Sequence, residues 1–91
     1  MIRLRLLPPL TRIVGKNEVL VDLDRAPLRL VLERALAQNG KFRSAVSDQS
    51  GLSHEYACLV NGDRFNLTEL GDVEVGEGDQ IAVLLPVAGG A

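Results

Sequence analysis

Few side chains in this sequence have the chemistry that catalysis or metal binding requires. The chain holds one histidine, His54, and one cysteine, Cys58. Because one histidine would have to serve every arrangement, neither a Ser-His-Asp nor a Cys-His set can be assigned. His54 has no second histidine and no spaced carboxylates for a metal site, so we interpret it as a loop residue. Cys58 falls within a predicted strand, where a lone cysteine is usually a small buried hydrophobic residue.

The glycines and acids of residues 71–79 do not predict a phosphate site. Gly71, Gly76 and Gly78 stand among acids, which would repel a phosphate group. The acids from Asp72 to Asp79 are either a solvated turn or a docking site for a basic patch on a partner protein. The acidic balance and the scarcity of aromatic residues also argue against binding of nucleic acid.

The composition indicates one small domain. The chain has 91 residues, 46% of them hydrophobic but only 3% aromatic, so Leu, Val, Ile and Ala must build the core. No apolar run approaches the ~18 residues of a membrane span, and the charges among residues 1–5 argue against a signal peptide. A lone cysteine forms no intrachain disulfide, which fits a reducing cytoplasm, the compartment we expect.

The net charge of −2 is unevenly distributed along the chain. Residues 1–45 carry nine Lys or Arg and four acids, whereas residues 46–91 carry one Arg and eight acids. Such a split marks either two electrostatic faces, one of them a docking surface, or basic and acidic strands that interleave and neutralise each other.

The first third of the sequence predicts a hairpin and a helix. Residues 2–7 alternate apolar and basic until Pro8 and Pro9 end the strand; a turn at 15–17 leads to a second strand over 19–24. An amphipathic stripe then predicts a helix with these apolar positions: Leu28, Val31, Leu32, Ala35 and Leu36. Pro27 suits its first position and Gly40 its C′ position, where φ is usually positive. Leu30, opposite the stripe, is either covered by the following loop or an exposed contact.

The remaining residues predict further strands. Residues 41–55 show no sustained period and indicate a long loop, with a short helical turn near 42–46. A strand over 56–60 is followed by the turn Asn61-Gly62-Asp63, a short return strand over 64–67, and a connection over 71–79. Ile81, Val83 and Leu85 indicate a last strand.

This order of elements predicts an α+β, β-grasp (ubiquitin-like) fold. One main helix would lie across a mixed sheet, with the last strand in the centre beside the first. We expect the domain to span residues 1–85 and a C-terminal tail, residues 86–91, to project from it.

The end of the chain resembles a known family. The run from Gly78-Asp79 through an apolar strand to Pro86-Val87-Ala88-Gly89-Gly90 is similar to the C-terminus of ubiquitin-like sulfur carriers, namely the small subunit of molybdopterin synthase and the thiamine sulfur carrier. Val60-Asn61-Gly62 resembles the segment before the family's turn.

The resemblance implies a protein without catalytic residues or a cofactor of its own. In the family an E1-like adenylating enzyme uses ATP to activate the terminal glycine carboxylate, and sulfur then replaces AMP to give a thiocarboxylate. The tail from Pro86 to Gly90 would enter the partner's active site, where glycines allow close backbone approach and Pro86 lowers the entropy lost on insertion. The alternative is a frayed terminus without function.

Ala91 departs from the family's pattern, because the carboxyl of Gly90 is held in a peptide bond. We expect a metalloprotease to cleave between Gly90 and Ala91; alternatively Ala91 is an artificial addition, or the carrier has lost thiolation. The expected destination of the sulfur is molybdopterin, with a large synthase subunit as acceptor, although a thiamine-type or cysteine pathway remains open. A ubiquitin-like modifier joined to lysines through Gly90 and a β-grasp binding module with an inert tail are the other hypotheses.

Overall fold

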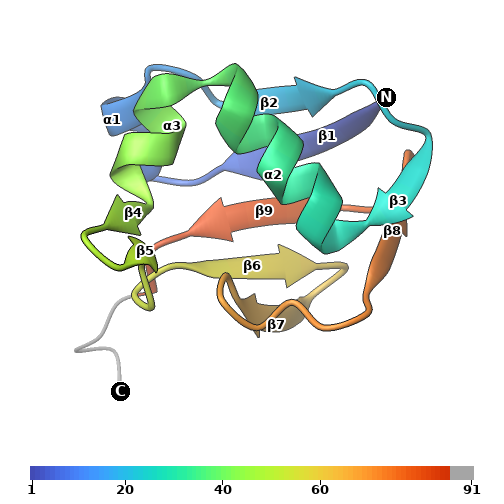
Figure 1. Ribbon diagram of the computed structural model, residues 1–91. Coiled ribbons are helices and arrows are strands. Elements are labelled where there is room, and N and C mark those ends of the chain that lie inside the picture. Colours follow the sequence, from blue (N-terminus) through green and yellow to red (C-terminus); the bar gives the residue numbers. More distant parts are fainter. Residues whose placement is uncertain (87–91) are drawn as a thin grey trace.

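The structure, a computed structural model, describes residues 1–86 and has the predicted β-grasp architecture (Figure 1). Its main sheet has the strand order β2-β1-β9-β6-β7. The bounds are β1 Ile2–Leu6, β2 Glu18–Val21, β6 Ala57–Val60, β7 Asp63–Asn66 and β9 Ile81–Leu84. The last strand, β9, lies in the centre, parallel to β1 and antiparallel to β6. The prediction of a central last strand beside the first is confirmed.

Helix α2 (Leu28–Gln38) crosses one face of this sheet (Figure 1). Four positions of the predicted stripe are buried and Leu36 packs partly buried against the core. Leu30 is also partly buried against the core, so it is not the exposed contact we considered. Pro27 stands just before the helix, as its N-cap residue.

Of the two further helices, the first was not predicted, and the second was predicted only as a short helical turn. Helix α1 (Leu10–Val14) interrupts the N-terminal hairpin and ends at Gly15, whose φ is +82°. Gly40 does not end α2 with a positive φ: it begins helix α3 (Gly40–Ala45), because the Asn39 side chain accepts the Phe42 N–H at 3.1 Å and caps a new helix. The predicted short turn near 42–46 is therefore this helix.

Two small two-stranded sheets stand in segments that we interpreted as loops. β3 (Arg25–Pro27) pairs with β8 (Glu74–Gly76), so the 71–79 connection is partly a strand. β4 (Ser47–Asp48) pairs with β5 (Gly51–Leu52) within the predicted 41–55 loop. Both pairs form through backbone hydrogen bonds in sequences too short to show a period.

The core lies between the sheet and the three helices. It contains the inward residues of β1, β6 and β9 together with those of α2, and Phe42 of α3 fills its end. Within residues 1–86 no helix is long and apolar enough to cross a membrane.

Candidate functional site at the two ends of strand β9

Strand β9 carries the C-terminal tail, so its fixation decides where the tail starts. Ile81 and Val83 are buried in the core at 1% and 0% exposure. On one side Val83 lies opposite Leu6, and on the other opposite Cys58. With neighbours on both edges and a buried face, β9 has one possible register.

A polar clamp formed by Asn61, Asp79 and Gln80 fixes the start of β9. The Asn61 side chain accepts the Gln80 N–H at 2.9 Å and donates to the Asp79 carboxylate at 3.1 Å. The Asn61 backbone N–H donates to the Gln80 carbonyl at 2.8 Å. These bonds join the two segments on which the family resemblance rests.

The Asp79 carboxylate also closes the turn before β9. It accepts the Gly76 N–H at 2.7 Å, and the Asp79 N–H donates back to the Gly76 carbonyl at 3.1 Å. Hydrogen bonds from Asn61 and from the Gly76 backbone lower the pKa of Asp79, because they stabilise its charged form. Asn61 itself has φ +50° and Gly62 φ +92°, the left-handed turn that Asn-Gly predicts.

The other end of β9, where the chain leaves the sheet, is held by backbone hydrogen bonds and by Leu85, which packs partly buried against the core. The Leu7 N–H donates to the Val83 carbonyl at 3.1 Å, and Leu84 lies opposite Ala57 at the start of β6. Leu85 and Pro86 follow, half-buried. The predicted reactive Gly90, the tail residues Val87, Ala88 and Gly89, and the predicted cleavage site at Ala91 lie outside the described residues.

The sheet face opposite α2 carries an apolar strip beside the tail's exit. Leu59 lies next to Ala82 across strands β6 and β9, and Leu84 continues the strip toward the tail. All three are half-buried rather than buried. We call these three residues the open-face strip. An apolar strip on an uncovered face indicates an interaction surface.

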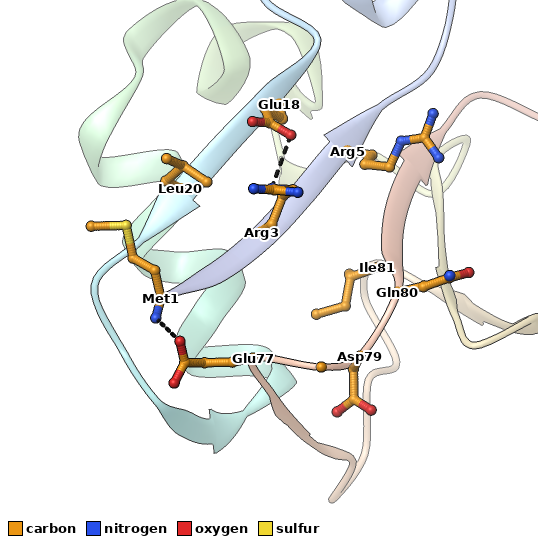
Figure 2. A pocket seen from close by; sticks show the side chains of 10 residues that line it. Met1, Arg3, Arg5, Glu18, Leu20, Glu77, Asp79, Gln80 and Ile81 are labelled. Atoms are coloured by element: carbon orange, nitrogen blue, oxygen red, sulfur yellow. Dashed lines mark hydrogen bonds and ion pairs between the residues drawn. The ribbon is translucent and has the colours of Figure 1, made fainter.

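Two arginines border the open-face strip. Arg5 lies opposite Ala82 on the β1 side, and Arg64 opposite Leu59 on the β7 side. Figure 2 shows Arg5 pointing away from Arg3, whose Nε is 3.1 Å from the Glu18 carboxylate. Within residues 1–86, neither Arg5 nor Arg64 has a carboxylate within 4.0 Å. Both charges are therefore available to a partner.

A hollow on the same face lies at the start of β9, away from the tail (Figure 2). Its charges are mostly paired: Arg3 with Glu18, and the Met1 ammonium with Glu77 at 2.6 Å. The ammonium lowers the pKa of Glu77 by hydrogen bonding and by its charge. Arg5 also lines the hollow and has no carboxylate within 4.0 Å among residues 1–86, so the hollow and the open-face strip share this unpaired cation.

The chain matches a known protein family over nearly its whole length. The ThiS family matches residues 4–90, and the match reaches the predicted reactive glycine. The chain belongs to the ThiS family. A comparison with curated proteins gives no match.

Solved structures support this membership of the ThiS family at the level of the fold. SAMP1 from Haloferax volcanii superimposes with a TM-score of 0.76 at 25% identity, over 96% of each chain. SAMP1 from Methanosarcina acetivorans gives 0.70 at 18% identity, over 96% of this chain and 93% of its own. Sulfolobus solfataricus Urm1 gives 0.63 at 20% identity, over 92% and 99%. Together with the family match over residues 4–90, the fold makes this chain a member of a family of ubiquitin-like carrier and modifier proteins, whose members work with E1-like activating enzymes.

The other predicted residues of this ThiS-family protein lie where their interpretation placed them. Cys58 is buried, and burial raises the pKa of its thiol to about 12, so the thiol stays protonated near neutral pH, as expected of a small buried hydrophobic residue. His54 is an exposed loop residue whose Nδ1 lies 3.4 Å from the Thr68 hydroxyl. Residues 1–86 contain no cluster of three His, Cys, Asp or Glu that could hold a metal.

The acids of residues 72–79 are partly structural rather than simply a solvated turn. Asp79 is part of the clamp, Glu77 pairs with the Met1 ammonium, and Glu74 lies 3.9 Å from Arg25. They stand at the end of β9 opposite the tail (Figure 1). A partner that receives the tail would meet the open-face strip before it met these acids.

The open-face strip and its two arginines were not predicted from the sequence. A signal was present: the last strand is apolar at every position from 81 to 85, so Ala82 and Leu84 are apolar where a solvent-facing strand would alternate. Such a run is typical of a strand whose two faces are both covered.

Proposed function

We propose that the protein is a sulfur carrier whose working group is the carboxylate of Gly90, exposed by cleavage before Ala91. The observation that carries the proposal is the ThiS-family match, which extends through Gly90 and leaves Ala91 outside. The fixed register of β9 supports it, because a clamp at one end and a buried strand set the point from which the tail departs.

The chemistry requires two steps at the Gly90 carboxyl. A carboxylate oxygen attacks the α-phosphorus of ATP and displaces pyrophosphate, giving an acyl adenylate. A sulfur nucleophile such as a persulfide or hydrosulfide then attacks the acyl carbon, and AMP leaves with the former carboxylate oxygen. Attack by a persulfide gives an acyl disulfide and AMP, and a thiol reductant must then cleave its S–S bond to release the thiocarboxylate; attack by hydrosulfide gives the thiocarboxylate directly. As long as Ala91 is attached, Gly90 has no carboxylate and neither step can start.

The open-face strip supports docking of an E1-like adenylating enzyme beside the tail. Leu59, Ala82 and Leu84 would be buried against an apolar patch of that enzyme, with Arg5 and Arg64 facing acids at its border. Because the strip lies on the strand that carries the tail, docking there aims the tail at the partner. The thiocarboxylate would then serve molybdopterin synthesis, with a large synthase subunit as acceptor, as the resemblance of the C-terminus suggests.

The experiment compares the full chain with a version that ends at Gly90. Both are incubated with ATP, Mg²⁺, the cognate activating enzyme and a sulfur donor, and the intact masses are measured. We expect the shortened form to gain the mass difference between sulfur and oxygen, and the full chain to stay unchanged unless a metalloprotease is added. If the shortened form remains unmodified while a control carrier is thiolated, the proposal is wrong. Thiolation of the full chain with Ala91 retained would contradict the processing step alone.

A second candidate function is attachment to other proteins through Gly90. The Haloferax and Methanosarcina relatives are named small archaeal modifier proteins, which favours this alternative. A digest of cells that express tagged protein would then contain Gly90 joined to lysine side chains by isopeptide bonds. If Gly90 is thiolated but no such peptide is found, the carrier function is supported and the modifier function is contradicted.

A further inference from the structure

The helical side of the molecule carries a concentration of positive charge. Six of the ten Lys and Arg residues of the chain lie on its helices or in the turn after α1, against one of the twelve acids, Glu33. All seven side chains are exposed. The six cations are Arg12, Lys16, Arg29, Arg34, Lys41 and Arg43. We call these six residues the helical cation patch.

None of these cations is paired within the part of the chain that the structure describes. No carboxylate of residues 1–86 lies within 4.0 Å of any of them, whereas Arg3 and Arg25 on the strands each have a partner. The helices and the turn after α1 carry six cations and one acid, whereas six of the twelve acids lie at residues 22–24 and 72–79, around β3 and β8.

Two of the cations occupy positions that helix electrostatics disfavours. Arg29 and Lys41 are the second residues of α2 and α3, and neither helix has an acid in its first turn. The positive end of a helix dipole repels a cation there, at a typical cost of about 0.3–1 kcal/mol. Arg12 and Arg43, in last turns, are by contrast favourably placed. Glu33, one turn after Arg29 on the same helix face, offsets part of this cost for Arg29, whereas α3 holds no acid that would do so for Lys41.

An apolar hollow lies within the helical cation patch. It is lined by Ile13 of α1 and by four residues of α3: Gly40, Lys41, Ser44 and Ala45. Ile13 is 51% exposed, the largest exposure of a large apolar side chain after Met1 within residues 1–86. Gly40 leaves room at the rim, since a Cβ there would meet no atom within 4 Å. An apolar side chain flanked by acids would fit this surface.

We infer that the helical cation patch is a second docking surface, which binds an acidic protein segment through one apolar side chain seated beside Ile13. The apolar hollow and the absence of exposed aromatic residues on this side favour a protein segment over a nucleic acid. The patch lies across the sheet from the open-face strip (Figure 1), so both surfaces can be occupied together. An acidic partner could hold the protein while an activating enzyme engages its tail.

The test is a titration of the full, isotope-labelled chain with a synthetic peptide of about 12 residues, long enough to pass along α2 and α3. The peptide consists of Glu and Asp with one central Leu. We expect amide shifts confined to the three helices and the 15–17 turn. A peptide with Ser in place of Leu should bind about fivefold more weakly, the loss of a partly buried apolar side chain.

Matched variants separate docking from folding. Arg29→Glu with Lys41→Glu should weaken binding about tenfold, yet should leave the melting temperature nearly unchanged, because an acid suits each first turn but the one at position 29 would lie one turn from Glu33. Arg25→Glu with Arg64→Glu changes the net charge equally and should leave binding unchanged. Ile13→Ser should weaken it, whereas Leu20→Ser, at a side chain of similar exposure on the other face, should not.

Three results would overturn the inference: shifts centred on the open face, equal binding of the Leu and Ser peptides, or tighter binding of a single-stranded oligonucleotide of the same charge. None of them bears on thiolation at Gly90, so the carrier function stands or falls separately.

Discussion

The two ends of strand β9 are held by different means. At its start, the Asn61 side chain and the Asp79 carboxylate form a network with the Gln80 and Gly76 backbone. At its exit, the Leu7 N–H donates to the Val83 carbonyl, Leu84 pairs with Ala57 of β6, and half-buried Leu85 and Pro86 follow. The start is thus complete within the domain, whereas the exit offers apolar surface that a partner can cover.

This difference separates stability from function along one strand. Changes at the clamp or in the core should lower the free energy of unfolding and leave the tail's chemistry intact in the folded fraction. Changes at the exit, in the tail or beside the strip should do the reverse.

The largest effect belongs to the tail. Gly90→Val in the chain shortened to residue 90 should abolish thiolation, because a β-branched side chain excludes the end from a channel shaped for glycine. The melting temperature should not change, since terminal residues contribute little to a core. Intact mass and a thermal melt check both expectations. A thiolated Gly90→Val chain would show that the channel does not select glycine.

The core of β9 should dominate stability. Ile81→Ala, at a side chain 1% exposed, should cost about 2–5 kcal/mol of unfolding free energy. Leu84→Ala, three positions on and half-buried, should cost clearly less but slow association with the activating enzyme. Urea denaturation measures the free energy of unfolding, and surface plasmon resonance measures the association rate. Equal stability losses would mean that Leu84 belongs to the core and not to a docking surface.

The clamp should have an intermediate effect. Asn61→Ala removes its side-chain hydrogen bonds and places Ala at φ +50°, so we expect a loss of about 1–2 kcal/mol. Asn61→Gly also removes the bonds but tolerates the φ, and should lose less. The difference in urea midpoints isolates the backbone contribution. A Gly variant that is as unstable as the Ala variant would place the whole effect in the hydrogen bonds.

The arginines beside the strip should affect association rather than folding. Arg5→Glu should slow binding to the activating enzyme several-fold at low salt, with the difference reduced at high salt as screening grows. Arg25→Glu, the same charge change at the far end, is the control. If both variants slow binding equally, net charge and not the strip directs the encounter.

The smallest effect on stability is expected from acid, which should weaken the clamp by protonating Asp79. Because hydrogen bonds lower the pKa of Asp79 in the folded state, its contribution is present above the unfolded pKa and is lost as the pH falls through the folded one. Asp79→Asn should therefore reduce stability near neutral pH and flatten its fall in acid. Urea midpoints measured from neutral pH downward test this. A parallel fall in both proteins would remove Asp79 as a source of acid sensitivity.

The sequence predicted the elements that have a clear period. The alternation in β1 and β2, the stripe of α2 and the Asn61-Gly62 turn all express local rules, and the β-grasp order follows from their succession. Helix α1 was missed although its signals were present: a Pro pair before it, Leu10 and Val14 buried one turn apart, and Gly15 at its end. Five residues are too few to show a helical period beside the strand before them.

The contacts that could not be predicted from the sequence join segments that lie far apart along the chain. The β3–β8 ladder pairs Ala26 with Val75, and no local pattern in either segment predicts this pairing. The clamp joins Asn61 to Asp79 in the same way. The resemblance to the family marked both residues without giving their physical role, which is to fix the register of β9.

The parallel arrangement of β1 and β9 also determines how the molecule responds to force. Their pairing joins residues 4–6 to residues 81–83, and the two strands run in the same direction. When the tail is pulled while the beginning of β1 is held, the force acts along the two strands. All the hydrogen bonds between them then carry the force at the same time. The pairs would have to shear as a group and could not open one after another from an end. A partner can therefore draw the tail into a narrow channel while the domain at its mouth keeps its shape.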